Sequence, residues 1–418
     1  MTQTLSEELT WRGFVNQTTY PDIAALDGAP ITFYWGVDPS AASMTVGHLA
    51  VAMMIRHFIS AGHKPILLVG GATGLIGDPD GKTQERDLKT NEEIDKNVQG
   101  IKRQYEQVFS GQDLKLVNNY DWFKDFGYLS FLREIGKHVP MRQMLGREFV
   151  QSRLGEDGAG ISYAEFSYSL IQGYDFLHLF KEHGATLQVC GADQWGNCIA
   201  GVELIRRISG GEAHIFSAPL VINKATGVKF GKSEEGAVWL DPALTSPYKF
   251  YQFWLNADDE SVKDYLKLYT MLSKDEYVQL IQEFEADKSA RKAQKVLAYE
   301  VTKIVHGEAR AQRVQKISEV LFGNGEYSEL KKEDFIELGE ELGMFEAHEG
   351  VDLAGSLVEA GLATSKGEAR RFLDSNAVYI NGSQIPLSKI TIDSDDAING
   401  FVVLRRGKNA QVIIKLGG

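Results

Sequence analysis

A run of small and polar residues, Pro39–His48, comes directly before an amphipathic helical pattern in the segment DPSAASMTVGHLAVAM. Gly47 has no side chain, so the backbone there can approach a ligand closely. The first N–H groups of a helix have no partner within the helix and attract anions. This arrangement favours binding of a nucleotide phosphate, although the same pattern also occurs in an ordinary connection between two elements.

Two lysines and a serine lie about 180 residues further along, in the glycine-bracketed segment LVINKATGVKFGKSEEG. Lys229, Lys232 and Ser233 are close enough in sequence to face one polyphosphate, whose negative charge two ammonium groups would neutralise. A surface lysine pair can equally remain solvated, so this segment alone does not establish a site.

Three polar side chains have a spacing that places them on one face of a helix. Tyr168, Gln172 and Asp175 are four and then three residues apart, within the otherwise apolar segment FSYSLIQGYDFLHLF. Such a stripe is unusual on a core-facing helix. It is either a set of satisfied buried side chains or part of a binding pocket.

Taken together and in this order on an α/β domain, the two loops resemble the HIGH and KMSKS signatures of class I aminoacyl-tRNA synthetases. Further segments resemble bacterial tyrosyl-tRNA synthetases, and the resemblance runs from about Trp11 to Lys415. The C-terminal residues are similar to the small RNA-binding fold first seen in ribosomal protein S four. The matching segments are FYWGVDPS, GGATGLIGDPDGKTQER, SYAEFSYSLIQGYDF, GADQWGN and SPYKFYQFW.

The resemblance implies a pocket for L-tyrosine. A buried polar partner for the phenol hydroxyl would disfavour phenylalanine, because that partner would be left without a hydrogen bond. The residues that the resemblance assigns are Tyr34 and Asp175 for the phenol, Asp78, Tyr168 and Gln172 for the α-ammonium group, and Gln194 for the carboxylate.

The resemblance also implies that ATP is a substrate. Tyrosine would be activated to tyrosyl-adenylate with release of pyrophosphate and then transferred to the 3'-terminal adenosine of tRNA(Tyr), with no covalent nucleophile from the protein. Mg²⁺ would be carried by the ATP phosphates, and no tightly bound cofactor is expected. The implied ATP-binding residues are Gly36, Asp38, Ser40, Gly47, His48, Gly191, Asp193 and Lys232, and the implied catalytic residues are Thr45, His48, Lys82, Arg86, Lys229, Lys232 and Ser233.

Two features of these loops leave questions open. Thr45 stands where the family usually has the first histidine of HIGH, and Ser40 stands where threonine is common. The shorter reach of threonine would weaken contact with the γ-phosphate, at a cost of about 1.5–3 kcal/mol, or about ten- to a hundredfold in rate. We therefore expect an active enzyme of reduced efficiency. Lys82 and Arg86 also fit an exposed charged loop without a catalytic role.

Short apolar runs alternate with helical patterns from Ile31 to about residue 220, beginning with ITFYWGV, HLAVAMMIRHFISAG and KPILLVGGATGLIGD. A strand, a helix and a strand in succession predict a parallel α/β unit, in which ligands bind beyond the carboxyl ends of the strands. We expect the site where Gly36–His48 meets Gly70–Pro79. The predicted fold class is α/β, with a Rossmann-like class I synthetase catalytic domain on a parallel sheet.

The character of the chain changes after this region. Residues 248–322 are rich in Leu, Lys, Glu and Ala without strand-like alternation, which predicts helices. From Val351, two short helical patterns precede AVYINGSQI and a final hairpin, FVVLRRGKNAQVIIK. The predicted parts are a catalytic domain at 1–225, a helical domain with the second loop at 226–322, an acidic linker at 323–350 and a small α+β RNA-binding domain at 351–418.

Composition is that of a multidomain globular protein. The 418 residues exceed one ordinary core, and no apolar stretch is long enough to cross a bilayer. The N-terminus lacks the pattern of a secretory signal, so we expect a cytoplasmic protein without membrane contact. Cys190 and Cys198 are expected to be buried reduced thiols, because neither belongs to a zinc-binding pattern.

The formal net charge of −13 argues against a protein that coats nucleic acid unspecifically. Two local regions are less acidic than the chain as a whole. Residues 288–316 carry eight Lys or Arg against Glu300 and Glu308, and residues 351–418 carry eight basic and seven acidic residues, a net charge of +1. Both are predicted tRNA surfaces. The family resemblance implies a homodimer with its interface near residues 120–150. Basic residues predicted to contact RNA in the C-terminal part are Lys366, Arg370, Arg371, Arg405, Arg406 and Lys408.

Three alternatives compete with a tyrosine-specific synthetase. A tryptophan-specific relative would share both loops, but Tyr34 with Asp175 and the C-terminal module favour tyrosine. An RNA-binding protein with this fold but weakened catalysis would have Thr45 as its first symptom, and the retained Asp78 and Gln172 argue against it. A nucleotidylyltransferase for a small acid would not need two RNA-binding regions.

Overall fold

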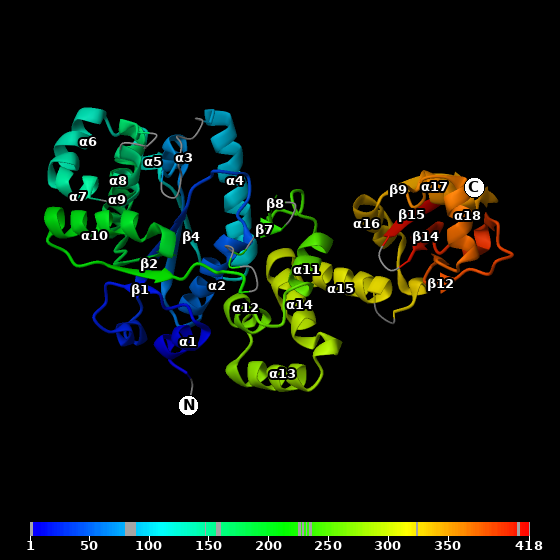
Figure 1. Ribbon diagram of the computed structural model, residues 1–418. Coiled ribbons are helices and arrows are strands. Elements are labelled where there is room, and N and C mark those ends of the chain that lie inside the picture. Colours follow the sequence, from blue (N-terminus) through cyan, green and yellow to red (C-terminus); the bar gives the residue numbers. More distant parts are fainter. Residues whose placement is uncertain are drawn as a thin grey trace. The chain divides into compact units, whose positions relative to one another are not determined.

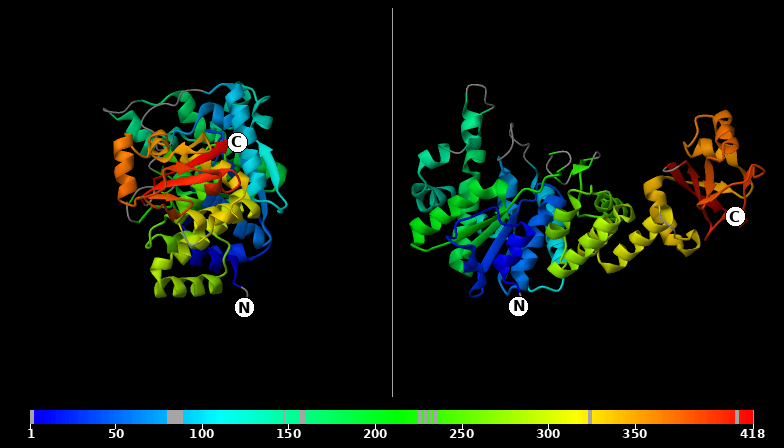
Figure 2. Two further views of the ribbon diagram at one scale, coloured as in Figure 1. Left: turned by 90° about the vertical axis from the view of Figure 1, so that its right-hand side faces the viewer. Right: turned by 60° about the horizontal axis from the view of Figure 1, so that its bottom comes forward.

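The computed structural model describes residues 3–79, 89–146, 148–155, 160–224, 227, 230, 232–233, 236–322, 325–407 and 410–417, with the backbone alone at a few of these positions. The chain divides into two compact units, residues 1–308 and 309–418. Figures 1 and 2 show the elements of each unit.

A six-stranded sheet of order β1-β6-β5-β2-β3-β4 forms the centre of the first unit. Strands β2 to β6 are parallel, whereas the short β1 joins the edge antiparallel to β6. The chain runs outward from β2 to β4 and then returns to the other side of β2, so the strand order reverses between β2 and β5. This reversal is where α/β sheets open a ligand crevice. The strands are β1 (Gln17–Thr18), β2 (Thr32–Val37), β3 (Lys64–Val69), β4 (Lys115–Asn118), β5 (Leu187–Gly191) and β6 (His214–Ala218).

Alternation of side chains along β2 explains why helices cover both faces of this sheet. Phe33 points toward α2, where its ring centroid lies 5.2 Å from that of Phe58. Tyr34 points to the opposite face, 5.1 Å from Phe176 of α9. Figure 1 shows α9 and α10 on one side of the sheet and α2 and α4 on the other. The helices are α1 (Leu5–Arg12), α2 (Val46–Ser60), α3 (Gly71–Ile76), α4 (Asn91–Val108), α5 (Tyr120–Phe123), α6 (Tyr128–Glu134), α7 (Met141–Leu145), α8 (Glu148–Leu154), α9 (Tyr163–His183) and α10 (Trp195–Ser209).

Helices follow the sheet, as the composition of this region predicts. α14 buries an apolar stripe at four-residue intervals, namely Ala293, Leu297, Val301 and Val305. Along the chain, a small hairpin, β7–β8, comes between the sheet and these helices and includes Lys232 and Ser233 of the second loop. The elements are β7 (Lys232–Ser233), β8 (Gly236–Ala237), α11 (Pro247–Leu255), α12 (Val262–Tyr269), α13 (Lys274–Ala286) and α14 (Lys292–His306), followed by α15 (Glu308–Phe322), which belongs to the second unit from Ala309 on.

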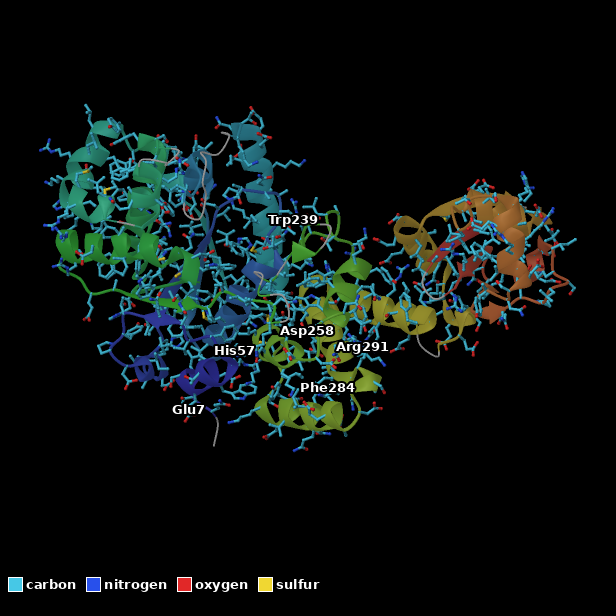
Figure 3. The ribbon with its side chains drawn as sticks, viewed as in Figure 1. Glu7, His57, Trp239, Asp258, Phe284 and Arg291 are labelled. Carbon is cyan, nitrogen blue, oxygen red and sulfur yellow. The ribbon has the colours of Figure 1, made fainter. Side chains whose placement is uncertain are left out.

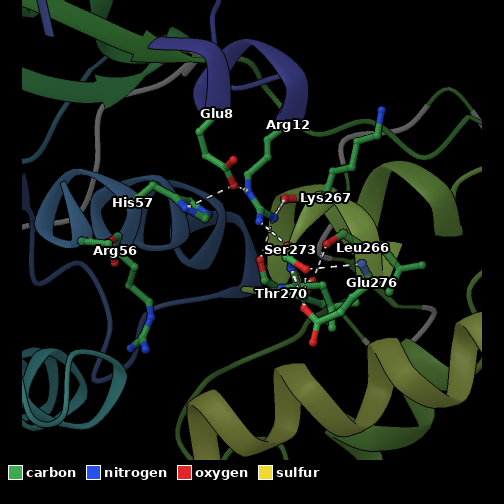
Figure 4. Close-up of polar contacts among 11 residues, drawn as sticks. Glu8, Arg12, Arg56, His57, Leu266, Lys267, Thr270, Ser273 and Glu276 are labelled. Atoms are coloured by element: carbon green, nitrogen blue, oxygen red, sulfur yellow. Dashed lines mark hydrogen bonds and ion pairs between the residues drawn. The ribbon is translucent and has the colours of Figure 1, made fainter. Parts of the chain in front are cut away.

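Arg12 fastens the N-terminal helix α1 to this helical region, as Figure 4 shows. Its guanidinium is buried and donates hydrogen bonds to the carbonyl oxygens of Lys267 at 2.8 Å, Thr270 at 2.9 Å and Leu272 at 2.5 Å. The Nε atom binds Glu8 at 2.6 Å. One charged side chain therefore supplies the hydrogen bonds that the carbonyl groups at the end of α12 lack within the helix.

The second unit contains a five-stranded sheet of order β12-β11-β14-β15-β9. The two short helices and the final hairpin predicted from the sequence are confirmed, and α17 and α18 pack on the sheet over a core that includes Leu357, Val378 and Ile414. The elements are α16 (Lys332–Leu342), β9 (Met344–His348), β10 (Val351–Asp352), α17 (Leu353–Glu359), α18 (Lys366–Asp374), β11 (Val378–Ile380), β12 (Ser383–Gln384), β13 (Thr391–Ile392), β14 (Phe401–Arg406) and β15 (Ala410–Gly417).

Residues 323–350 differ from the linker that we expected. They hold α16 and β9, and β9 pairs in parallel with β15. Phe335 of α16 stacks on Phe401 with ring centroids 5.4 Å apart. The apolar signal is weak because α16 buries few large side chains, and the strand that receives β9 lies far along the sequence. The described part of this segment belongs to the folded second unit.

Candidate active site

A cavity of about 660 Å³ lies at the carboxyl ends of β2 and β5, where the strand order reverses. Small-molecule sites commonly have volumes of roughly 300–1,000 Å³. Lys82, Arg86 and Lys229 lie outside the described residues, and only the backbone of Lys232 and Ser233 is described. The other predicted site residues all line the cavity: Tyr34, Gly36, Asp38, Ser40, Thr45, Gly47, His48, Asp78, Tyr168, Gln172, Asp175, Gly191, Asp193 and Gln194.

One part of the cavity wall combines Tyr34 with Asp175. The Tyr34 hydroxyl is buried, and no described residue gives it a hydrogen bond. Asp175 is 2% exposed and accepts hydrogen bonds from Asn119 Nδ2 at 3.0 Å and from Trp122 Nε1 at 2.9 Å. A ligand hydroxyl at this wall would therefore meet an unpaired hydroxyl and a carboxyl group whose orientation is fixed.

Burial controls the ionisation of these two groups. It raises the pKa of Asp175 to about 8, against the opposing effect of the hydrogen bonds from Asn119 and Trp122, and the charge of Asp38 raises the pKa further. Burial likewise raises the pKa of Tyr34 well above its ordinary value. At neutral pH Tyr34 is a neutral hydroxyl, and Asp175 is mostly protonated but able to ionise when a ligand donates a hydrogen bond to it.

A chain of hydrogen bonds joins this wall to the carboxylate of Asp38. Tyr168 donates its hydroxyl to Asp38 Oδ2 at 2.7 Å, and Thr73 donates to Asp38 Oδ1 at 2.6 Å. Asn119 donates to Thr73 Oγ1 at 3.0 Å, besides its bond to Asp175. A Cβ atom at Gly70 would lie 2.1 Å from Asp38 Oδ1, so glycine there leaves room for the network.

A second carboxylate, Asp78, has amide partners. Gln194 Nε2 lies 2.6 Å from Asp78 Oδ2, and Asn197 Nδ2 lies 3.4 Å from Asp78 Oδ1. The amide oxygen of Gln172 is buried and has no hydrogen bond from any described residue. Two carboxylates, a tyrosine hydroxyl and an unpaired amide oxygen on one cavity suit a ligand that carries an ammonium group.

The first loop presents a histidine at the start of α2. The backbone N–H of Thr45 donates to His48 Nδ1 at 3.1 Å, and Thr45 Oγ1 lies 3.1 Å from the same atom. Because Nδ1 accepts a backbone N–H, the neutral ring carries its proton on Nε2. A ring donor and the N-terminus of a 15-residue helix therefore line the cavity together, which favours an anionic group such as phosphate.

Backbone hydrogen bonds tie this first loop to the residues that follow the β7–β8 hairpin. Val46 N–H donates to Val238 O at 3.1 Å, and Leu240 N–H donates to Met44 O at 2.9 Å. Trp239, labelled in Figure 3, forms a bridge with Thr45 between them. The hairpin that includes Lys232 and Ser233 in β7 is thus fastened at its downstream end beside the start of α2. Sequence reasoning did not predict this pairing.

Sequence reasoning also missed three residues that orient the site. Thr73 holds Asp38, and Asn119 and Trp122 hold Asp175. Asn119 directly follows β4, so its place at the carboxyl edge of the sheet was an available signal. Trp122 lies in the segment that we assigned to a dimer interface, and no sequence pattern indicated its contact with the site.

The basic region 288–316 differs from a free cationic surface. Lys292 pairs with Glu283, and Lys288 pairs with Glu285 at 3.2 Å. Arg291, labelled in Figure 3, donates to the carbonyl oxygen of Leu255 at 2.7 Å. Lys303, Arg313 and Lys316 also have acidic partners. Several of these acids lie outside the stretch, which is why its local charge overestimates its free positive charge.

The two cysteines are free and buried, as expected. Within the described residues, no group of three His, Cys, Asp or Glu side chains is arranged to hold a metal ion. None of the described helices combines the length and the apolar composition that crossing a membrane requires.

A parallel sheet with a cavity at its reversal point, a helix N-terminus and a lysine-bearing hairpin is the arrangement of an enzyme that binds a nucleotide beside a second small ligand. Two family profiles match the sequence. The family "tRNA synthetases class I (W and Y)" matches residues 26–323, and the "Tyrosine--tRNA ligase SYY-like C-terminal domain" matches residues 334–414. The chain belongs to the class I tRNA synthetases of the W and Y family.

Individual relatives agree over almost the whole chain. The tyrosine-tRNA ligase of Geobacillus stearothermophilus is 44% identical, covering 98% of this chain and 99% of its own, and that of Salmonella arizonae is 45% identical over 98% and 97%. The solved structure of a C-terminally truncated mitochondrial tyrosyl-tRNA synthetase from Aspergillus nidulans is 30% identical, with a TM-score of 0.68 over 75% of this chain and 93% of that chain. A tryptophanyl-tRNA synthetase from Plasmodium falciparum, 13% identical with a TM-score of 0.54 over 78% and 86%, shares the fold alone.

Proposed function

We propose that the protein is a tyrosine-tRNA ligase. It activates L-tyrosine with ATP to tyrosyl-adenylate, releases pyrophosphate and transfers the tyrosyl group to the 3'-terminal adenosine of tRNA(Tyr). The observation that carries the proposal is that Tyr34, with its unpaired hydroxyl, and Asp175 line one cavity that also presents Asp38 and Asp78. The names of the relatives that match 98% of the chain support it.

Tyrosine is recognised through its two polar ends. The phenol hydroxyl donates to Asp175 and accepts from Tyr34, whose hydroxyl is otherwise unpaired. The α-ammonium group takes the place between Asp78, Tyr168 and Gln172. Phenylalanine would leave the buried Tyr34 and Asp175 without their partner, and that unmet hydrogen bonding disfavours it.

Activation is a displacement at phosphorus that requires positioning and charge stabilisation. A carboxylate oxygen of tyrosine forms a bond with the α-phosphorus of ATP, and the bond from that phosphorus to the bridging oxygen breaks as pyrophosphate leaves. His48 and the start of α2 contact the phosphates, and Lys82, Arg86, Lys229, Lys232 and Ser233 neutralise the leaving group. Mg²⁺ enters with ATP as part of that substrate. Gly191 and Asp193 hold the ribose, with Gly36, Asp38 and Ser40 completing the nucleotide site.

Thr45 differs from the histidine usual in the family, and its contacts indicate a second role. Its backbone and hydroxyl both lie 3.1 Å from His48 Nδ1. Thr45 therefore helps to orient His48, which offsets part of its shorter reach to the γ-phosphate. This contact supports an active enzyme over the alternative of a synthetase fold with weakened catalysis.

Transfer to tRNA completes the reaction. A hydroxyl of the terminal ribose attacks the tyrosyl carbonyl carbon, and AMP leaves. Arg370 and Arg371 are exposed on α18 and suit phosphate contacts, whereas Lys366 forms an ion pair with Asp352 at 3.0 Å. Arg405 and Arg406 lie over the rings of Tyr379 and Phe372. Lys408 lies outside the described residues.

A homodimer and a cytoplasmic location complete the proposal. Large apolar side chains between residues 120 and 163 are exposed, including Tyr128 at 60%, Leu129 at 79%, Met141 at 57% and Tyr163 at 62%. An apolar surface of this kind is typical of a protein–protein interface, and a second copy of the chain is the proposed partner. The cytoplasmic location rests on the relatives that match nearly the whole chain, which come from bacteria, where tRNA is charged in the cytoplasm.

ATP–pyrophosphate exchange tests the activation step on the purified protein. We expect exchange with tyrosine, none above background with phenylalanine or tryptophan, and at least a tenfold loss of rate in a Lys232→Ala variant. The exposed Arg206, which pairs with Glu203 at the surface, offers a control, and Arg206→Ala should keep the wild-type rate. Exchange with tryptophan in preference to tyrosine would contradict the assigned substrate, and no exchange with any amino acid would favour the weakened synthetase.

A further inference from the structure

Phe230 lies between Lys229 and Lys232 in the sequence, and its ring is surrounded by other aromatic rings. We call these rings the aromatic socket. The nearest ring of the aromatic socket is that of Tyr265, whose centroid lies 4.2 Å from that of Phe230. Its members are Phe253 and Trp254 of α11, at 5.1 and 5.4 Å, and Tyr265 and Tyr269 of α12, the last at 5.9 Å.

The same phenylalanine also belongs to the substrate cavity. Phe230 lines the cavity together with Leu220 and Val221, and its backbone N–H donates to Val221 O at 2.8 Å. Phe230 therefore touches the cavity on one side and the socket on the other. Its ring joins the second loop to both α11 and α12, besides the surface pair that Lys224 of the same loop forms with Asp264 of α12.

The hairpin is thus held at both ends by different means. Downstream, residues 238–240 are bound to the first loop through backbone hydrogen bonds, which no side-chain substitution removes. Upstream, Lys224 pairs with Asp264 of α12 at the surface, and the half-buried Phe230 inserts its ring into the socket. The contact of Phe230 depends on one side chain and can be removed alone, while the Lys224–Asp264 pair stays in place.

We propose that Phe230 is a positioning residue for activation: its seat in the aromatic socket fixes where the lysines that flank it in sequence meet the leaving phosphates. The inference rests on the proposed function. Phe230 acts through those lysines and transfers no proton or charge itself. For this role the side chain at position 230 must be large and apolar, and it needs no polar group.

The role predicts a separation between binding of tyrosine and the rate of activation. The proposed tyrosine-binding residues lie in β2, in α9 and in the segments that follow α3 and β5, all outside the second loop. The lysines contact the ATP phosphates, on which further negative charge builds as pyrophosphate leaves, so misplacing them lowers kcat and leaves the ground-state affinity for tyrosine unchanged. A residue needed merely for folding would lower both, or would lower the amount of folded protein.

The test measures ATP–pyrophosphate exchange in the full chain with Phe230→Ala, Phe230→Leu and Tyr265→Ala. We expect Phe230→Ala to lower kcat about ten- to a hundredfold, with the KM for tyrosine within about twofold of the wild-type value. Phe230→Leu should recover a large part of the rate. Because the ring and its socket act together, the double variant Phe230→Ala, Tyr265→Ala should lose no more of kcat than the more damaging of the two single variants.

Controls separate this role from the stability of the fold and from the proposed function. Phe345, a half-buried phenylalanine of β9, does not line the cavity, and Phe345→Ala should exchange at the wild-type rate. A wild-type kcat in Phe230→Ala would overturn the inference while leaving the proposed function intact. Equal losses of kcat and of tyrosine affinity would also overturn it. Absence of exchange in the wild-type protein would contradict the proposed function and, with it, the inference.

Discussion

The carboxyl group of Asp175 is subject to opposing influences. Burial raises its pKa to about 8, and the hydrogen bonds from Asn119 and Trp122 act in the other direction. At pH 7 the carboxyl group of Asp175 is therefore mostly protonated before a ligand binds. A phenol hydroxyl that donates to it stabilises the ionised form, so binding of tyrosine lowers the pKa and the proton leaves.

Because binding lowers the pKa of Asp175, the binding of tyrosine at pH 7 should release protons. Roughly one proton should be released per site, because a group with a pKa near 8 is protonated before binding and ionised afterwards. Calorimetry in two buffers of different ionisation enthalpy measures this number. Asp175→Asn has no proton to lose and should give equal enthalpies in both buffers at saturating tyrosine. Equal enthalpies in the wild-type protein would show that binding does not change the protonation of Asp175 and would contradict this prediction.

The sequence predicted most of the residues that line the cavity, because the resemblance carried them as sets within short segments. It did not predict the residues that orient them. Thr73, Asn119 and Trp122 act through side-chain hydrogen bonds that cross from one element to another, and such contacts leave no periodic trace in a sequence. Which oxygen of Asp38 or Asp175 each donor reaches depends on the packed structure.

At the scale of elements, the strand–helix–strand unit from β2 to β3 and the helices after Pro247 followed from periodicity and are confirmed. The structure of segment 323–350 did not follow from periodicity. Its strand β9 pairs with a strand almost seventy positions later and has little apolar signal of its own. Long-range anchors such as Arg12 are equally invisible, since its carbonyl partners lie more than 250 residues away in the sequence.

Replacing Arg12 should destabilise the first unit. Arg12→Met keeps the apolar stem but leaves three carbonyl oxygens and Glu8 without their donor, so we expect a loss of about 3–5 kcal/mol in the free energy of unfolding. Urea unfolding of the first unit, followed by tryptophan fluorescence, measures it. The matched control is Arg206→Met, whose side chain is 60% exposed and whose loss should be within about 0.5 kcal/mol. Equal stability of the two variants would show that the buried hydrogen bonds contribute nothing net.

The whole molecule combines an acidic total charge with a C-terminal unit for which we propose RNA binding. The region 288–316 contributes less free positive charge than its sequence indicated, because acids of α13 pair with Lys288 and Lys292, and acids within the second unit pair with Arg313 and Lys316 of that same unit. Arg370 and Arg371, which are exposed on α18, are then the basic residues that we propose for contacts with RNA. Charge counts along a sequence cannot reveal such pairing, since it depends on which helices come together.

Transfer of tyrosine to tRNA is the step that distinguishes the proposed ligase from every alternative. The most direct measurement incubates the full chain with ATP, Mg²⁺, labelled tyrosine and a tRNA(Tyr) transcript, and follows acid-precipitable label over time. We expect ester-linked tyrosine on the 3'-terminal adenosine, removed by mild base, and no label with phenylalanine or tryptophan. Formation of adenylate without charging of tRNA, or charging with tryptophan, would contradict it.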